Sequence, residues 1–135
     1  MKLMLDTNIC IHIIRRKPPE VLEVFQAYTP GDVCISAITL AELEYGAEKS
    51  AFPEKNKLAL ALFLSGIAIL PFDETASAEY GRIRASLEKA GTPIGANDLL
   101  IAAHAKSQGL MLVTNNTREF CRVEGLKVEN WVETA

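Results

Sequence analysis

The sequence predicts an α/β domain in which helices flank a mainly parallel central sheet of about four or five strands. Short apolar runs of strand length alternate with longer segments of helical periodicity, and this alternation is typical of parallel α/β sheets. Proline, glycine and asparagine mark the breaks between these segments. The chain has 135 residues, of which 49% are hydrophobic and 23% charged, so we expect one folded domain over residues 1–135.

Each predicted strand is a short run rich in aliphatic or β-branched side chains. The first run, KLMLD, closes on Asp6, and the second, VCIS, closes on Ser36. Pro71 ends the third run, and the fourth leads into a stretch of threonine and asparagine. The predicted strands are residues 2–6, 33–36, 67–70 and 110–113, with residues 127–131 as an edge strand.

Helical segments are expected between the strands, and prolines and glycines set their limits. Pro19 suits the first turn of a helix, where its missing N–H would have no partner inside the helix. Gly91 and Gly109 are placed to end the helices before them. Thr7 and Asn8 are candidate caps of the first helix. The predicted helices are residues 9–16, 19–28, 38–48, 54–65, 75–90, 98–108 and 117–123.

The charge balance limits the class of partner. With 14 basic and 17 acidic residues the net charge is −3, which argues against a broadly basic nucleic-acid coat but allows a local basic rim. Cys10, Cys34 and Cys121 form no CxxC pair, so neither a disulfide framework nor a zinc site is expected. The longest apolar run, residues 58–70, is too short for a bilayer, and no signal peptide precedes the first strand. We therefore expect a cytoplasmic protein without a membrane partner.

Four carboxylates stand where a parallel sheet collects functional groups. They are Asp6 at the end of the first strand, Glu42 after the second, Asp98 after the loop GTPIGAN, and Glu119 after the fourth strand. Ligands of such sheets bind beside the carboxyl ends of the strands, so these side chains are expected to meet. Two charges about 4 Å apart repel by about 4 kcal/mol at an effective dielectric constant near 20. A divalent cation would remove that penalty, and oxygen-only ligands favour Mg²⁺ or Mn²⁺ over zinc.

Each carboxylate also has a structural interpretation. Asp6 and Asp98 could cap the helices that follow them, and Glu119 could complement a helix dipole. Thr39 together with Glu42 matches a capping box. Considered together, the coincidence of all four at one edge of the sheet favours a metal site.

Other catalytic patterns are missing from the sequence. It contains no P-loop, no GxGxxG motif and no GxSxG nucleophile elbow. His12 and His104 have no partner at metal-ligand spacing, and His104, six residues after Asp98, is expected to face away from that carboxylate. Both histidines are therefore interpreted as structural or surface residues.

Four segments in this order resemble PIN-domain proteins and, more narrowly, VapC-type toxins of type II toxin–antitoxin systems. They are MLDTNICI (residues 4–11), SAITLAELEYGAEKS (36–50), TPIGANDLLIAAHA (92–105) and VTNNTREF (113–120), followed by the tail RVEGLKVENW (122–131). The resemblance runs nearly end to end. It implies a PIN-like fold and a metal-dependent endoribonuclease that uses Mg²⁺, with Mn²⁺ as a substitute.

The family pattern also implies roles for individual residues. Asp6, Glu42 and Asp98 carry over as catalytic metal ligands. The fourth acidic position is open, because many PIN domains have an aspartate where this chain has Asn116, whereas Glu119 resembles the acid that some VapC toxins use. We favour Glu119 as the fourth catalytic metal ligand, with Asn116 as a polar helper. The number of metal ions, one or two, is left open.

The expected reaction is hydrolysis of an RNA phosphodiester bond by water, which leaves 5′-phosphate and 3′-hydroxyl ends. The candidates for orienting carboxylates or water are Thr7, Asn8, Thr114, Asn115 and Asn116. Arg118 and Arg122 lie four residues apart on one face of a predicted helix and are candidates for binding RNA phosphates. A solvated surface is the alternative for these two arginines.

The resemblance implies three partners: a VapB-type antitoxin that blocks the site, a second toxin in a homodimer, and an RNA substrate, with the anticodon loop of initiator tRNA as the expected target. The apolar runs at residues 9–14 and 58–64 either form a groove for a partner helix or belong to the core. Two other functions remain as alternatives. One is a PIN-fold module that binds RNA or protein without cutting, and the other is a metal-dependent phosphatase of the haloacid dehalogenase kind, although that family has an aspartate where this chain has Asn8.

Overall fold

Five strands form one sheet in the computed structural model, which describes residues 2–132. The strands are β1 (Leu3–Leu5), β2 (Val33–Ser36), β3 (Ala68–Leu70), β4 (Met111–Val113) and β5 (Val128–Glu129). Their order across the sheet is β3-β2-β1-β4-β5, and every neighbouring pair is parallel. The predicted α/β fold with a parallel sheet is therefore confirmed, including the edge strand.

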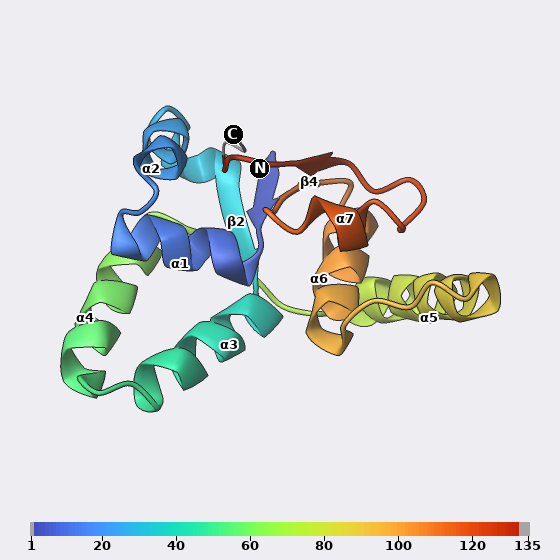
Figure 1. The fold of residues 1–135 in the computed structure, drawn as a ribbon, viewed down its shortest axis with the longest axis horizontal. Coiled ribbons are helices and arrows are strands. Elements are labelled where there is room, and N and C mark those ends of the chain that lie inside the picture. Colours follow the sequence, from blue (N-terminus) through green and yellow to red (C-terminus); the bar gives the residue numbers. More distant parts are fainter. Residues whose placement is uncertain (1, 133–135) are drawn as a thin grey trace.

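Seven α-helices flank the strands in this described part of the chain. They are α1 (Thr7–Arg15), α2 (Pro19–Gln26), α3 (Ala37–Glu48), α4 (Pro53–Leu64), α5 (Glu74–Ala90), α6 (Ala96–Ser107) and α7 (Thr117–Phe120). Figure 1 shows α1, α2 and α4 on one side of the strands and α5, α6 and α7 on the other. Every predicted helix is found, although α7 is three residues shorter than predicted. None of the described helices is both long and apolar enough to cross a membrane.

The register of the sheet brings the ends of three strands to one edge. Leu3 of β1 is level with Val33 of β2 on one side and with Met111 of β4 on the other. Beyond the last pair of β1 and β4, the backbone N–H of Asp6 still donates to the carbonyl of Val113, at 3.0 Å. The helices α1, α3 and α7 start from this edge, so their first residues lie near one another.

The core lies on both faces of the sheet because successive residues of a strand point to opposite sides. In β1, Leu3 and Leu5 pack with residues of α1 to α4, whereas Met4 packs with residues of α5 and α6. Cys10 and Cys34 are free and buried, as expected of small core side chains. The sheet is therefore sandwiched between two helical layers, and only its edges are free to present a site.

The start of α3 differs from the sequence interpretation. Ser36 is its N-cap, and the Ser36 hydroxyl oxygen accepts a hydrogen bond from the N–H of Ile38 at 3.1 Å. Thr39 is buried inside the helix rather than at its end. The capping box of Thr39 and Glu42 is therefore wrong, because the serine two residues before Ile38 already holds the free N–H group. Glu42 lies in the middle of α3 and has no capping role.

The start of α6 also lies earlier than predicted. The helix begins at Ala96, with Gly95 as its N-cap, so the preceding loop is shorter than the seven residues of GTPIGAN. Asp98 consequently lies in the first turn and does not cap α6, so that interpretation of Asp98 is wrong. The glycine cap explains why α6 starts earlier than predicted, because Gly95 has no side chain and the helix begins without a side-chain cap.

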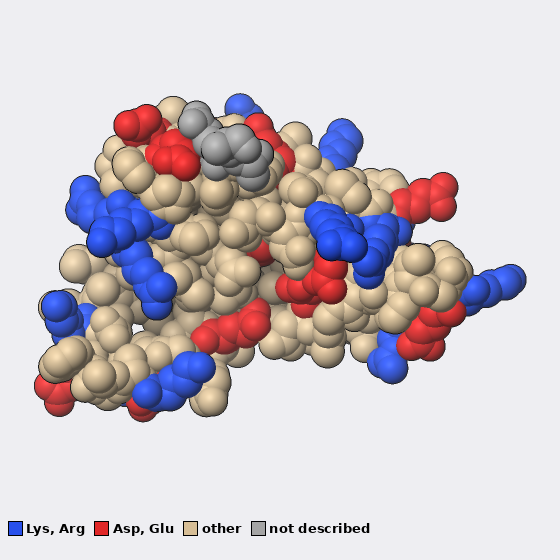
Figure 2. Space-filling model, in the orientation of Figure 1, with Lys and Arg blue, Asp and Glu red and all other residues tan. Residues whose placement is uncertain are grey.

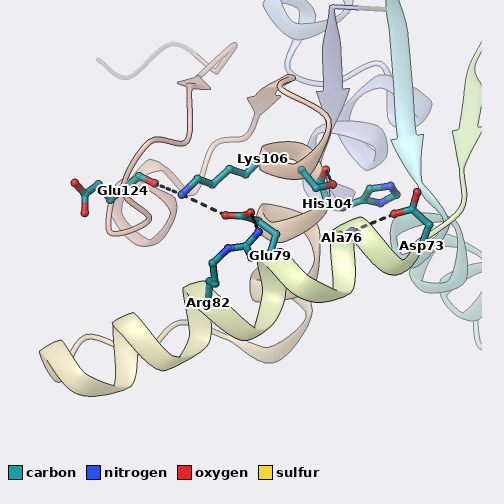
Figure 3. Close-up of polar contacts among 8 residues, drawn as sticks. Asp73, Ala76, Glu79, Arg82, His104, Lys106 and Glu124 are labelled. Carbon is teal, nitrogen blue, oxygen red and sulfur yellow. Dashed lines mark hydrogen bonds and ion pairs between the residues drawn. The ribbon is translucent and has the colours of Figure 1, made fainter.

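Polar contacts fix α6 against α5, as Figure 3 shows. Glu79 of α5 lies between Arg82 of the same helix and Lys106 of α6, and the Lys106 ammonium is 3.5 Å from the Glu79 carboxylate. The same ammonium donates to the carbonyl of Glu124 at 2.7 Å. Asp73 caps the beginning of α5. These contacts hold α6, the helix that carries Asp98, against α5.

Candidate active site

The four predicted carboxylates reach one edge of the sheet from four different elements. Asp6 follows β1, Glu42 is on α3, Asp98 is on α6 and Glu119 is on α7. Figure 2 shows acidic side chains along the hollow between the two helical layers, with Lys and Arg side chains on both sides of it. The distribution of charge therefore matches the predicted acidic site with a local basic rim.

Asp6 is a buried carboxylate with two structural contacts. It is 3% exposed and caps α1 by accepting the N–H of Ile9 at 2.9 Å, so the predicted caps Thr7 and Asn8 are wrong. Burial raises the pKa of Asp6, although hydrogen bonds from the Thr114 side chain and the Ile9 N–H act in the opposite direction. The interpretation of Asp6 as a helix cap is correct. A cap does not require a buried charged side chain, however, so capping alone does not explain why a carboxylate is buried here.

Glu42 is held by neutral donors from two other helices. One carboxylate oxygen accepts the hydroxyl of Thr7 at 2.5 Å, and the other accepts the Nδ2 amide of Asn97 at 2.9 Å. Thr7 was among the predicted orienting residues, whereas sequence reasoning missed Asn97. The only signal for Asn97 was its place beside Asp98, because the contact depends on how α6 packs against α3. These two bonds fix the Glu42 carboxylate without neutralising its charge.

Asp98 and Glu119 form a hydrogen-bonded pair of carboxyl groups. Burial, then the hydrogen bond and the negative charge of Glu119, together raise the pKa of Asp98 to about 7. The pKa of Glu119 is lowered by its hydrogen bond to Asp98 and then by that to Asn116. Asp6 and Glu42 also repel the Asp98 charge. Burial and the repulsion between carboxylates that the sequence predicts at this edge therefore both act on Asp98.

Asn116 is the polar helper that the sequence predicts beside this pair. Its Nδ2 amide donates to Glu119 at 2.7 Å and lies 3.3 Å from the Asp98 carboxylate. Its own backbone N–H donates to the hydroxyl of Thr114 at 2.9 Å, and Thr114 in turn contacts Asp6. One buried threonine and one amide thus connect three of the four carboxylates.

The carboxylates have the chemistry of a site for a hard divalent cation. All the charged donors are oxygens, and the pKa values of Asp6 and Asp98 are raised by burial and by repulsion from other carboxylates, which a cation would offset. Within residues 2–132, however, no three His, Cys, Asp or Glu side chains lie close enough together to form a ready-made metal site. Donor type and charge therefore fit a metal ion, whereas the spacing of the described side chains does not by itself form a metal site.

His12 lies nearer to this site than sequence reasoning implied. Its Nδ1–H donates to the carbonyl of Lys17, and its Nε2 is 3.5 Å from the amide of Asn115. Its electrostatic interaction with Asp6 lowers the pKa of that carboxyl group. No spacing in the sequence signals this, because the end of α1 meets the loop after β4 only in the folded chain. Asn8 is exposed, and no hydrogen bond of its side chain is found among the described residues.

Arg118 and Arg122 lie beside Glu119 but do not share a helix face. The helix α7 ends at Phe120, so only Arg118 is on it, and the predicted common face is wrong. Arg122 donates to the carbonyl of Pro93 at 2.9 Å, and its charge lowers the pKa of Glu119. Both side chains are exposed, so they remain candidates for binding phosphates.

Comparison with known proteins places this arrangement in a family. The model of the PIN domain matches residues 3–126. The chain is 52% identical over 132 residues to Ribonuclease VapC2 of Haemophilus influenzae, covering 98% of this chain and 99% of the relative. It is also 52% identical over 131 residues to the tRNA(fMet)-specific endonuclease VapC of Shigella flexneri, covering 97% of this chain and 98% of the relative.

Solved structures agree with the sequence comparison. The fold matches that in the crystal structure of DNA-bound VapBC from Salmonella typhimurium with a TM-score of 0.93 and 48% identity, over 98% of this chain and 99% of that chain. It matches VapBC2 from Rickettsia felis, bound to a fragment of promoter DNA, with a TM-score of 0.91 and 41% identity, over 98% of this chain and 100% of that chain. The agreement covers the whole arrangement of sheet and helices around the four carboxylates.

Proposed function

This chain belongs to the PIN-domain family and, within it, to the VapC ribonuclease toxins of toxin–antitoxin systems, and we propose that it hydrolyses tRNA with a divalent cation held by Asp6, Glu42, Asp98 and Glu119. The observation that carries the proposal is the position of the four carboxylates at one edge of the sheet, where Asp6 is buried and Asp98 is hydrogen-bonded to Glu119. Several carboxylates so close together repel one another and destabilise the fold, but they form a suitable site for a cation.

The chain's own residues prepare the site for that cation. Thr7 and Asn97 orient Glu42, and Asn116 orients the pair of Asp98 and Glu119. Cation binding would favour the ionised form of both carboxyl groups of this pair. A bound Mg²⁺, with Mn²⁺ as a substitute, supplies Lewis-acid chemistry by polarising a phosphate and activating water. Attack by water rather than by the ribose 2′-hydroxyl leaves 5′-phosphate and 3′-hydroxyl ends.

The substrate that we propose is tRNA, with initiator tRNA as the first one to test. This choice is supported by the name of the Shigella flexneri relative, a tRNA(fMet)-specific endonuclease. The exposed Arg118 and Arg122 flank the carboxylates and would offset the negative charge that RNA brings to them. We propose phosphate contacts for both, with no role in selecting the base sequence.

The partner that we propose is a VapB-type antitoxin seated in the grooves around α1 and α4. One groove of about 670 Å³ lies between α1, α2 and α4, and another of about 600 Å³ runs from Thr7 and Glu42 towards α4. Of the predicted apolar runs, Ile13 and Leu60 are buried and belong to the core, whereas Leu62 is 68% exposed and open to a partner. A helix laid in an apolar groove is a common mode of peptide recognition. We also propose a homodimer, which light scattering of the purified toxin would test.

The proposed activity is tested by sequencing RNA ends after brief expression of the wild type, and by cleavage of purified tRNA with Mg²⁺ or with EDTA. We expect new 5′-phosphate ends, and cleavage that stops in EDTA and returns with excess Mg²⁺. Cleavage that persists in EDTA, or that leaves cyclic phosphate ends, would contradict the metal mechanism. Hydrolysis of p-nitrophenyl phosphate without RNA cleavage would instead favour a phosphatase.

We predict that Arg118→Gln weakens RNA binding without changing which RNA is bound. The loss of one phosphate contact should lower affinity for every RNA about three- to tenfold and reduce the slope of log affinity against log salt by about 0.7. The measurement is filter binding at several salt concentrations with a cleavage-deficient variant as background. Lys89→Gln, an exposed charge at the end of α5, is the matched control and should change neither value. An equal effect of both substitutions would mean that only net charge matters.

A further inference from the structure

Two polar side chains in the core connect the helix of Glu42 with the helix of Asp98. Ser36 and His104 are both fully buried, and Nδ1 of His104 is 2.7 Å from the Ser36 hydroxyl oxygen. His104 belongs to α6, whereas Ser36 ends β2 and caps α3. The hydroxyl that holds the first turn of α3 is therefore the same one that α6 contacts through the histidine.

A second polar contact joins the same two helices at the site itself. Asn97 at the start of α6 donates to Glu42 of α3 at 2.9 Å. The two contacts lie six residues apart on the α3 side and seven apart on α6, which corresponds to about 9 and about 10.5 Å at 1.5 Å per residue. Their order is reversed between the helices, so α3 and α6 run in opposite directions. Because both spacings agree, the core contact sets where Glu42 stands relative to the start of α6.

The surroundings of His104 connect its ring to the start of α5. The ring meets Phe72 edge-on at 5.4 Å. Burial lowers the pKa of His104, whereas the charge of Asp73 and a backbone hydrogen bond at Pro71 act in the opposite direction. Figure 3 shows the ring beside Asp73, where the chain enters α5. Three elements around the sheet thus converge on this histidine.

We propose that His104 is a positioning residue for the metal site: through Ser36 it fixes α3 against α6, so that Glu42 and Asp98 can act on the same cation. The inference rests on the proposed function, because it assigns His104 a role only if these carboxylates bind a metal. Metal ligands need to be held within about half an ångström of their working geometry, which two separate helices cannot ensure without a fixed contact between them. His104 touches neither substrate nor cation.

The test compares His104→Leu, which keeps much of the volume and removes the hydrogen bond, with Ser36→Ala and with the double variant. In the absence of RNA, thermal shift against Mg²⁺ concentration measures metal binding directly. We expect the half-saturating concentration of Mg²⁺ to rise about tenfold in each variant and no further in the double one, because the pair acts as a unit. KM for RNA should stay within twofold of the wild type, and excess Mg²⁺ should restore most of kcat.

Thr39→Val is the matched control, because Thr39 is also fully buried on α3 and its hydroxyl has no partner among the described residues. It should leave Mg²⁺ binding unchanged. A half-saturating concentration within twofold of the wild type in His104→Leu, or additive effects in the double variant, would overturn the inference. If His104→Leu does not fold, His104→Met against Thr39→Val decides in the same way, because it also removes the hydrogen bond to Ser36 and leaves the Ser36 cap of α3 in place. A wild type without any response to Mg²⁺ would overturn the proposed function and this inference together.

Discussion

Replacing Asp98 with asparagine is expected to lower RNA cleavage at saturating Mg²⁺ by about a thousandfold or more. Asp98 is hydrogen-bonded to Glu119, and its ionised form supplies a charge to a cation. Loss of one charged ligand removes several kcal/mol of transition-state stabilisation, and about 4 kcal/mol corresponds to three orders of magnitude in rate. Single-turnover cleavage of tRNA measures the effect.

The same substitution is expected to stabilise the metal-free protein above neutral pH. The pKa of Asp98 rises from 3.8 to about 7 on folding, so the folded chain binds this proton more tightly than the unfolded chain does. The free energy of unfolding therefore falls as pH rises from about 4 to 7 and is level above. A pKa shift of this size lowers the free energy of unfolding by at most about 4 kcal/mol. The lowered pKa of Glu119 has the opposite effect on stability, so we expect a net gain of about 1–2 kcal/mol for Asp98→Asn.

Urea unfolding in EDTA at several pH values tests whether the substitution that lowers cleavage also stabilises the metal-free protein. Asp98→Asn should exceed the wild type in stability at pH 8, by an amount that shrinks towards pH 4, and Mg²⁺ should stabilise only the wild type. Glu23→Gln, at an exposed position on α2, is the control and should show no such pH dependence. Equal stability of Asp98→Asn and wild type at pH 8 would mean that the carboxylates do not repel one another as described.

The general position of the site follows from the sequence because a parallel sheet collects the ends of its strands. Asp6, Glu42 and Glu119 could be assigned to that edge from short apolar runs alone. The orientation of His104 also followed from helical periodicity, since six residues place it away from Asp98 and it is buried on the far side.

The donors that hold the carboxylates could not be predicted in the same way. Asn97 reaches Glu42 across two helices that are 55 residues apart in the chain, and His12 reaches Asn115 across 103 residues. Such contacts depend on how helices pack, which local patterns do not specify. The capping box failed for a related reason: Thr39 and Glu42 have the required spacing, but Ser36 lies closer to the end of β2 and takes the cap.

Asp6 separates the two interpretations of the carboxylates most sharply, because it caps α1 and is also a proposed metal ligand. Asp6→Asn keeps an oxygen for the N–H of Ile9 and loses the charge, whereas Asp6→Ala loses both. We expect both variants to lose cleavage by about a thousandfold, because the charge is what the cation needs. The two variants should differ in stability. Asp6→Asn should be at least as stable as the wild type, because burial raises the pKa of Asp6 and so penalises its charge. Asp6→Ala should lose about 1 kcal/mol of stability because it also removes the helix cap.

Asp73 provides the matched comparison, because it caps α5 by accepting the N–H of Ala76 at 3.0 Å and lies outside the site. Asp73→Asn and Asp73→Ala should repeat the division in stability and leave cleavage unchanged. If Asp6→Asn cut tRNA as well as the wild type does, Asp6 would be a cap and nothing more, like Asp73. If Asp6→Asn lost cleavage while remaining folded, the charge of Asp6 would be needed to hold the metal, because the cap of α1 does not require it.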